Sequence, residues 1–142
     1  MLVEFIPIVE NSYPLSYKTA GDSGIDLPAH IDAPFTLDIG GRAMIPTGYK
    51  CKLAPGYEGQ IRSRSGLALK EGIIVLNAPG TVDNAYRGPV NVILYNCSNK
   101  LYTINPGDRI AQFVVALISH ESAYDENVLV ERGEGGFGST GK

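Results

Sequence analysis

The chain of 142 residues has no tryptophan, only two cysteines and only two histidines. Cys51 and Cys97 lie far apart in the sequence, without a CxxC spacing or a nearby histidine cluster, so a structural zinc site lacks ligands. We therefore expect two buried free thiols. Neither His30 nor His120 accompanies a serine or cysteine in a nucleophile-elbow sequence. This absence argues against a hydrolytic triad and favours solvated histidines.

Long hydrophobic runs are also missing. The longest one, Phe113–Ile118, is far shorter than the roughly 20 residues that a membrane-spanning helix needs. The first residues include acidic side chains and Pro7, whereas a secretory signal peptide has a basic start and an unbroken apolar stretch. These absences predict a soluble intracellular protein, either cytoplasmic or, if a virus encodes it, located in the host cell.

An excess of positive charge is absent as well. The chain has 12 lysine and arginine residues against 15 aspartate and glutamate residues, which gives a formal net charge of -3. Non-specific binding to nucleic acid or to an anionic membrane needs a basic surface. We therefore expect neither a nucleic acid nor a membrane as partner, and any phosphate-binding site must be local.

Turn-forming and apolar residues are what the chain has in quantity. It contains 17 glycines, 9 prolines and 8 tyrosines, and 44% of its residues are hydrophobic while only 19% are charged. Such a chain is too apolar to be intrinsically disordered and long enough to bury one core without disulfide bonds. Many turns and little helix favour an all-β fold in a single domain.

Short apolar runs alternate with turn residues, at a spacing typical of an antiparallel sandwich or barrel. The predicted strands are Val3–Val9, Arg42–Leu53, Glu58–Arg64, Gly72–Leu76, Val90–Tyr95 and Arg109–Ile118. A type II turn is predicted where Pro106 and Gly107 are the central residues, and it should join Leu101–Ile104 to Arg109–Ile118 as a hairpin. Helix is expected only at Ser65–Glu71 and at Ser122–Val130.

Residues 132–142 differ from the rest of the chain. Five of them are glycine and only Phe137 is aromatic, which is too little apolar surface to offset the entropy of ordering the segment. Alone it should be a flexible arm, although Arg132, Phe137, Ser139 and Thr140 could order it as a lid over a ligand. A frayed tail explains this composition equally well. We divide the chain into a β domain, residues 1–131, and this C-terminal arm, residues 132–142.

Five separated segments combine glycine, aspartate, arginine and serine outside the expected core. In chain order they are Ala20–Leu27, Arg64–Ala68, Gly80–Gly88, Gly107–Gln112 and Arg132–Gly141. In this order and at these spacings they resemble the five motifs of the trimeric dUTP pyrophosphatases, the dUTPases. The third segment, GTVDNAYRG, and the fifth, RGEGGFGSTG, are unusual strings, so a chance match of all five is very improbable.

The resemblance implies a fold, an assembly and a reaction. The fold would be a jelly-roll-like β-barrel or sandwich, assembled as a homotrimer whose active sites are shared between subunits. The enzyme would be a dUTP diphosphatase that uses Mg2+ to hydrolyse dUTP to dUMP and pyrophosphate. This reaction keeps uracil out of DNA and supplies dUMP for dTMP synthesis.

The third segment carries the residues that resemble the family's catalytic ones. Asp83 is similar to the general base that activates a water for in-line attack on the α-phosphorus, a role that needs an ionised carboxylate. Tyr86 resembles the tyrosine whose ring packs on deoxyribose and leaves no space for a 2′-hydroxyl. Without the resemblance, a β-turn aspartate and an edge-strand or core aromatic would be the preferred interpretations.

The pyrimidine site is implied by the same part of the chain. Asn77 resembles the residue that reads the pyrimidine edge, together with backbone groups of Thr81, Val82 and Asp83 in the hairpin that receives uracil. A narrow pocket there can refuse the 5-methyl group of thymine and the 4-amino group of cytosine. By itself, Asn77 would be interpreted as a turn former.

The phosphates have their own set of candidate residues. The main phosphate-binding residues of the family are resembled by Arg64, Ser65 and Gly66. There a guanidinium group, a hydroxyl and backbone N–H groups converge on the phosphates. The alternative is a helix N-cap with a solvated arginine. Gln112 resembles a further phosphate contact.

Supporting and metal-binding roles are implied around these residues. Asp108 and Arg109 would form an ion pair that supports Gln112. Asp26 resembles the acidic residue that holds Mg2+ through the metal's bound waters, and one carboxylate is enough because Mg2+ keeps waters and bridges phosphates. Alternatively, Asp26 is an ordinary turn aspartate.

In the family, the fifth motif closes over the active site of another subunit. Here Phe137 would stack on uracil, while Arg132, Ser139 and Thr140 would meet the terminal phosphates, with Gly138 also at the substrate. Charge stabilisation by these cations and Mg2+ is the expected main source of rate in phosphoryl transfer.

Two other functions stay open. A dCTP deaminase has the same fold but typically shows R-S-S-x-A-R in the second motif, where Arg64–Leu69 reads RSGLAL. A non-catalytic binder could instead use the dUTPase fold to regulate a partner. The chain departs from common family residues at Asn84, Ala85 and Pro89, and it is more polar than usual at positions 22 and 23.

Overall fold

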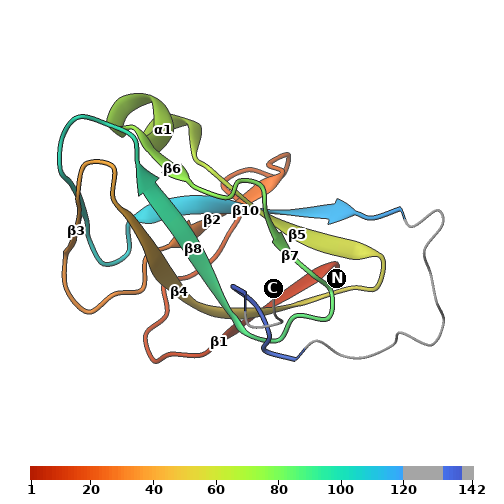
Figure 1. The fold of residues 1–142 in the computed structure, drawn as a ribbon. Coiled ribbons are helices and arrows are strands. Elements are labelled where there is room, and N and C mark those ends of the chain that lie inside the picture. The colour runs from red at the N-terminus through yellow and green to blue at the C-terminus, as the bar shows by residue number, and fades with distance from the viewer. Residues whose placement is uncertain (120–132, 139–142) are drawn as a thin grey trace.

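The structure is a computed structural model, and it describes residues 1–119 and 133–138. Within these residues the chain forms ten strands and one short helix (Figure 1). They are β1 (Val3–Pro7), β2 (Gly24–Pro28), β3 (Phe35–Leu37), β4 (Arg42–Leu53), β5 (Tyr57–Arg62), α1 (Ser65–Glu71), β6 (Ile73–Val75), β7 (Gly80–Val82), β8 (Pro89–Asn96), β9 (Tyr102–Ile104) and β10 (Arg109–Leu117).

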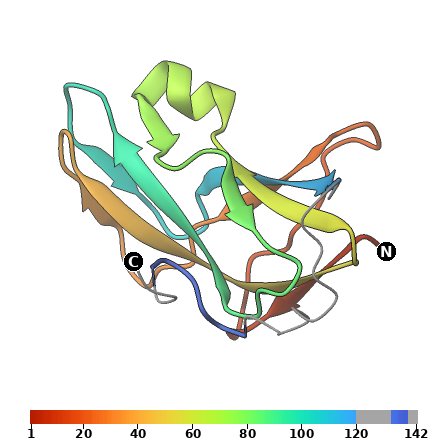
Figure 2. The same cartoon turned by 45° about the vertical axis from the view of Figure 1, so that its right-hand side comes forward.

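The strands form two four-stranded sheets and one two-stranded sheet, and all of their pairings are antiparallel. The first sheet has the order β1-β4-β8-β6, the second β2-β10-β5-β7, and the third pairs β3 with β9. Figures 1 and 2 show β4 and β8 crossing the strands of the second sheet, with α1 at one end of the molecule. The expected all-β, jelly-roll-like architecture with little helix is confirmed.

The core lies between the two larger sheets because their strands bury alternate residues. In β8 the side chains of Val90, Val92 and Leu94 are buried, while the residues between them are partly exposed. Phe113 of β10 is 1% exposed, and its ring occupies the space where any side chain at Gly59 of β5 would lie. This packing fixes the two sheets and, with them, the loops that carry the candidate residues.

Most predicted elements are confirmed, with ends that differ by a few residues. The predicted strands correspond to β1, β4, β5, β6, β8, β9 and β10, and the helix over Ser65–Glu71 is α1. This helix ends because Gly72 adopts a left-handed conformation with φ of 66°. β2, β3 and β7 were not predicted as strands. The second predicted helix, Ser122–Val130, lies outside the described residues.

The predicted hairpin is wrong, although its turn is correct. The Asp108 N–H donates to the Asn105 carbonyl oxygen at 3.1 Å, and Gly107 has a φ of 83°. However, β9 pairs with β3, while β10 pairs with β2 and β5. The turn therefore carries the chain from one sheet into another, because local turn chemistry does not choose the partners of the strands it joins.

Two smaller expectations also need correction. Cys51 is buried as expected, but Cys97 is exposed, beside the end of α1. His30 is not simply solvated, since its Nδ1 atom is buried and has no hydrogen-bond partner among the described residues. His120 lies outside those residues. Over residues 1–119 and 133–138, no helix is long and apolar enough to cross a membrane.

Candidate active site

Two cavities collect the predicted site residues that the structure describes, with the exception of Gly138. The first, of about 310 Å³, is lined by Asp26, Arg64, Ser65, Gly66 and Gln112, which come from the first, second and fourth segments. The second, of about 250 Å³, is lined by Asn77, Thr81, Val82, Asp83, Tyr86 and Phe137. Apart from Asn77, these residues come from the third and fifth segments. The two cavities share no lining residue. We call them the phosphate cavity and the base cavity, after the roles that the resemblance implies.

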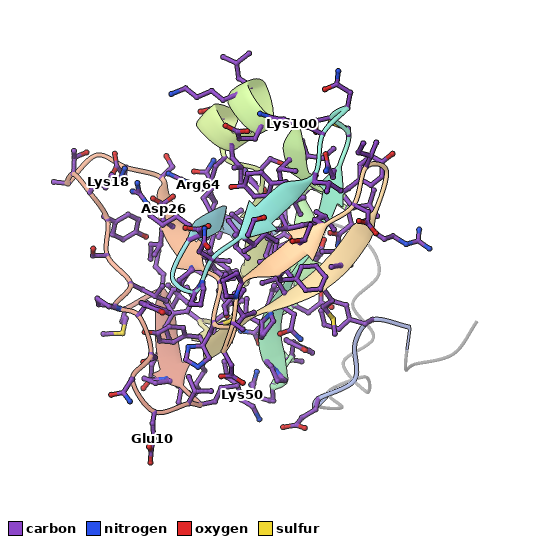
Figure 3. The ribbon with its side chains drawn as sticks, turned by 90° about the vertical axis from the view of Figure 1, so that its left-hand side faces the viewer. Glu10, Lys18, Asp26, Lys50, Arg64 and Lys100 are labelled. Atoms are coloured by element: carbon purple, nitrogen blue, oxygen red, sulfur yellow. The ribbon has the colours of Figure 1, made fainter. Side chains whose placement is uncertain are left out.

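Asp26 of β2 is the centre of an ion-pair cluster in the phosphate cavity. Its Oδ1 accepts a hydrogen bond from Arg64 Nε at 3.0 Å, and its Oδ2 accepts one from Arg109 Nη1 at 3.0 Å. Arg64 Nη1 also donates to the Arg109 carbonyl oxygen at 2.8 Å, and Figure 3 shows Arg64 beside Asp26. Arg64 is therefore not a freely solvated cap residue. Arg109 pairs with Asp26, whereas Asp108 was its expected partner.

Gln112 of β10 is held in place by its neighbours on both sides. Its Nε2 donates to the Ser63 carbonyl oxygen at 3.0 Å. Gly24 of β2 lies against the Gln112 side chain, since a Cβ at Gly24 would be 2.5 Å from Gln112 Oε1. A side chain at position 24 would displace the amide, so this glycine has a steric reason to be present. The predicted Gln112 thus lies in the same cavity as Arg64.

The base cavity is built on the edge strand β7 and the turn before it. Gly80 of β7 is buried, and the Asn77 side chain lies against it, 3.1 Å from where a Cβ would be. Thr81 is exposed and Val82 is buried, as expected of alternating residues in a strand. The cavity therefore combines the polar Asn77 side chain with the backbone of an edge strand.

Tyr86 forms a fixed wall of the base cavity. Its hydroxyl donates to the Pro89 carbonyl oxygen at 2.9 Å. The ring lies directly against Gly88, where any Cβ would overlap the phenol, and against Gly136. Partial burial raises the pKa of Tyr86, so the phenol stays neutral and keeps its donor proton at ordinary pH.

Asp83 stands at the end of β7 in a loop that several hydrogen bonds hold. Its carbonyl oxygen accepts the Tyr86 N–H at 3.0 Å. The Asn84 side chain donates to the Leu53 carbonyl oxygen at 2.6 Å, which ties the loop to the end of β4. Arg87 Nη1 donates to the Asn84 carbonyl oxygen at 2.6 Å. These hydrogen bonds fix the backbone of the loop that carries Asp83.

Residues 133–138 of the arm lie against the base cavity of their own chain, whereas the resemblance implied that the arm covers the active site of another subunit. The Arg87 N–H donates to the Gly133 carbonyl oxygen at 2.6 Å, and Glu134 forms an ion pair with Lys50. Phe137 lines the cavity but is 58% exposed, and Gly138 follows it with a φ of 91°. The predicted Arg132, Ser139 and Thr140 lie outside the described residues.

Several lining residues were not predicted. Ser16, Lys18 and Asp22 line the phosphate cavity, and Asn91 and Ile93 line the base cavity. The alternation of β8 offered a signal for the last two, since residues 89, 91 and 93 share a face of the strand. For Lys18 the only signal was its position just before the first segment.

The described part of the chain has no group of three or more His, Cys, Asp or Glu side chains that could bind a metal ion without other ligands. Mg2+ does not need one, because it usually keeps several waters and uses one or two carboxylates with substrate phosphates. Asp26 suits that mode: each carboxylate oxygen accepts one arginine and retains a lone pair for a metal-bound water.

The chain resembles known proteins in sequence over most of its length. A family model described as dUTPase matches residues 11–141. The deoxyuridine 5'-triphosphate nucleotidohydrolase of Caulobacter vibrioides is 52% identical over 130 residues, covering 89% of this chain and 84% of that protein. The enzyme of the same name from Fusobacterium nucleatum is 49% identical over 128 residues, covering 89% of this chain and 88% of that protein.

Solved structures share the fold at lower sequence identity. A mutant dUTPase from phage phi11 of S. aureus, in which a structural Mg(II) ion is coordinated, superposes with a TM-score of 0.75 at 21% identity, covering 87% of this chain and 95% of that one. The EIAV dUTPase gives 0.72 at 22% identity, covering 90% of this chain and all of that one. With a family model that matches almost the whole chain and relatives that are about half identical to it, the chain belongs to the dUTPase family.

Proposed function

We propose that this chain hydrolyses dUTP to dUMP and pyrophosphate. The observation that carries the proposal is that residues from separate segments gather in two cavities, one rich in phosphate-binding groups and one bounded by an edge strand, an amide and an aromatic ring. The curated relatives at about 50% identity are named for the same reaction, which supports the assignment.

In this proposal Asp83 is the general base. It removes a proton from a water that attacks the α-phosphorus in line with the leaving pyrophosphate. A carboxylate can accept a proton from water, and Asp83 lies in a loop anchored through Asn84. The P–O bond to the β-phosphate breaks, and the charge moves to the departing pyrophosphate.

Base and sugar selection are assigned to the base cavity. Asn77 and the backbone of Thr81, Val82 and Asp83 would read uracil, because an edge strand offers unpaired N–H and C=O groups at fixed positions. The Tyr86 ring would exclude a ribose by steric overlap with its 2′-hydroxyl, because the hydrogen bond from the Tyr86 hydroxyl to Pro89 holds the ring in place. Phe137 would stack on the base.

Charge stabilisation is assigned to the phosphate cavity and to the arm. Arg64, Ser65 and Gly66 would bind the phosphates together with Gln112, while Asp26 would hold Mg2+ through water. When bound, Mg2+ would neutralise part of the phosphate charge. Arg132, Ser139 and Thr140 of the arm, with Gly138, complete the proposed set.

We also propose a homotrimer in which each active site is shared. Asp83 and Arg64 line different cavities of one chain, yet both are assigned to one dUTP molecule. A base cavity of one subunit facing the phosphate cavity of the next would unite them. The arm, residues 132–142, would then cover a site of the trimer, beside a β domain of residues 1–131. We propose a soluble protein in the cytoplasm or in an infected host cell.

Pyrophosphate release by the purified protein with Mg2+ tests the proposal, with dUTP, dCTP, dTTP and UTP as substrates. Turnover of dUTP alone is expected. If dCTP released ammonia, the deaminase would replace the pyrophosphatase. If dUTP were bound without cleavage, the non-catalytic binder would take its place.

A further inference from the structure

The phosphate cavity contains a cation that the predicted site lacks. Lys18 lies on the loop before β2 and lines this cavity together with Asp26, Arg64 and Gln112. Figure 3 shows Lys18 on this loop, on the same side of the molecule as Arg64 and Asp26. Lysine at this point contributes a point charge with three donors to a cavity assigned to phosphates.

The charge balance of the cavity leaves room for a further cation. The single carboxylate of Asp26 binds Arg64 and Arg109 at the same time, so it offsets one of their two positive charges. A triphosphate carries several negative charges, and its binding needs cations whose charge is not already compensated. Arg64 alone therefore supplies less attraction than its formal charge suggests.

Among residues 1–119 and 133–138, no carboxylate forms an ion pair with the Lys18 ammonium group. Asp22 of the same cavity interacts with the Lys18 charge only beyond ion-pair distance, because its carboxylate is hydrogen-bonded to backbone and hydroxyl donors. Its Oδ2 accepts the Lys18 and Thr19 N–H groups at 3.0 and 2.9 Å, and its Oδ1 accepts the Thr19 hydroxyl at 2.7 Å.

These hydrogen bonds also give Lys18 a defined place. The Asp22 N–H donates to the Thr19 carbonyl oxygen at 3.2 Å, so residues 18–22 form a closed turn around one carboxylate. A lysine at the start of such a turn has a restrained backbone while its long side chain stays exposed and adjustable. The turn can thus present the ammonium group at the mouth of the cavity.

We infer that Lys18 is a further substrate-binding residue, which contacts the polyphosphate of the nucleotide. The inference rests on the proposed function and names an additional contact at the same site. Its effect should fall on phosphate affinity and not on the chemical step, because the ammonium group neither activates the water nor fixes the base.

The test compares Lys18→Gln, Lys18→Arg and, as a matched control, Lys52→Gln, which alters an exposed lysine of β4 outside both cavities. We expect Lys18→Gln to raise KM for dUTP and Kd for inorganic pyrophosphate about tenfold, the loss typical of one charge-assisted hydrogen bond. kcat should stay within about twofold, because the lost contact stabilises the bound substrate and the transition state equally. Lys18→Arg should retain most of the affinity, and the phosphate-free probe deoxyuridine should bind all variants equally.

Unchanged affinity for pyrophosphate in Lys18→Gln would overturn the inference. So would an equal loss in Lys52→Gln, or a parallel loss for deoxyuridine, which would indicate general damage to the fold. Pyrophosphate binding is measured by calorimetry with Mg2+ present, whether or not dUTP is hydrolysed. A wild-type protein that binds pyrophosphate through Lys18 but leaves dUTP intact would therefore refute the proposed function and not this inference.

Discussion

Tyr86 has little freedom at the position where it stands. Its hydroxyl is bonded to the Pro89 carbonyl oxygen, and its ring packs against Gly88 on one side and Gly136 on another. This packing restricts where the ring can lie, and steric exclusion of a 2′-hydroxyl requires a ring in a fixed position. The proposed sugar selection is therefore a property of the residues around Tyr86 as much as of the tyrosine itself.

Gly88→Ala tests this dependence. The added Cβ overlaps the Tyr86 phenol, so the ring must shift and its bond to Pro89 must break. We expect kcat/KM for dUTP to fall about tenfold or more, the preference for dUTP over UTP to shrink, and stability to fall by about 1–3 kcal/mol.

The matched control for this variant is Gly21→Ala, where a Cβ would meet nothing within 4 Å. It should keep the wild-type preference for dUTP over UTP, because position 21 lies outside the base cavity. If Gly88→Ala kept this preference as well, the ring would not be the selecting element.

The two cysteines should differ in reactivity. Burial raises the pKa of the Cys51 thiol to about 11, partly opposed by the charge of Arg87, whereas Cys97 is exposed. At about pH 8, iodoacetamide should modify Cys97 and spare Cys51 until the protein is unfolded, as peptide mass spectrometry would show.

The same shift predicts a direction for stability. Because the folded-state pKa of Cys51 lies above the unfolded one, folding favours the neutral thiol. This contribution is complete below the unfolded pKa and is lost as the pH rises through about 11. Denaturant unfolding of the wild type and of Cys51→Ala at rising alkaline pH would check it. Equal pH dependence in the two proteins would contradict the assignment.

At the scale of elements, sequence patterns predicted the strands and the helix whose formation depends on nearby residues. The long strand β4 and helix α1 were placed correctly, because apolar alternation and a left-handed glycine are local signals. β3 and β7 have three residues each, too few for a periodic pattern. The partner of β9 could not be predicted, because pairing with β3 depends on the packing of the whole chain.

The candidate site shows the same limit. Resemblance to family motifs named Arg64, Asp26 and Gln112, and the structure brings them to one cavity. The hydrogen bond between Asp26 and Arg109 joins two segments that are distant in the sequence. Lys18 belongs to none of the five segments, although it lines the same cavity. Such contacts are properties of the folded chain, so sequence patterns gave no access to them.

At the scale of the whole molecule, the separation of the two cavities makes a prediction about assembly. Asp83→Asn and Arg64→Ala should each inactivate a homogeneous protein. When the two chains are coexpressed or refolded together, some sites should combine an intact Asp83 with an intact Arg64 from a neighbouring subunit. Random assembly of equal amounts gives about a quarter of such sites, and therefore about a quarter of wild-type activity.

Light scattering on the same samples should give about three times the mass of one chain. Mixed trimers without any recovered activity would show that each site is built from one chain. A monomer with full activity would contradict the shared site directly.

Pyrophosphate release from dUTP, measured for the wild type and for Asp83→Asn with Mg2+, tests the proposed function most directly. The wild type should turn over dUTP and leave dCTP, dTTP and UTP essentially intact. Asp83→Asn should still bind dUTP but lose about a hundredfold or more in kcat, as expected when a general base is removed. Asp83→Asn that cleaves dUTP at the wild-type rate, or a wild type that does not cleave it, would contradict the proposal.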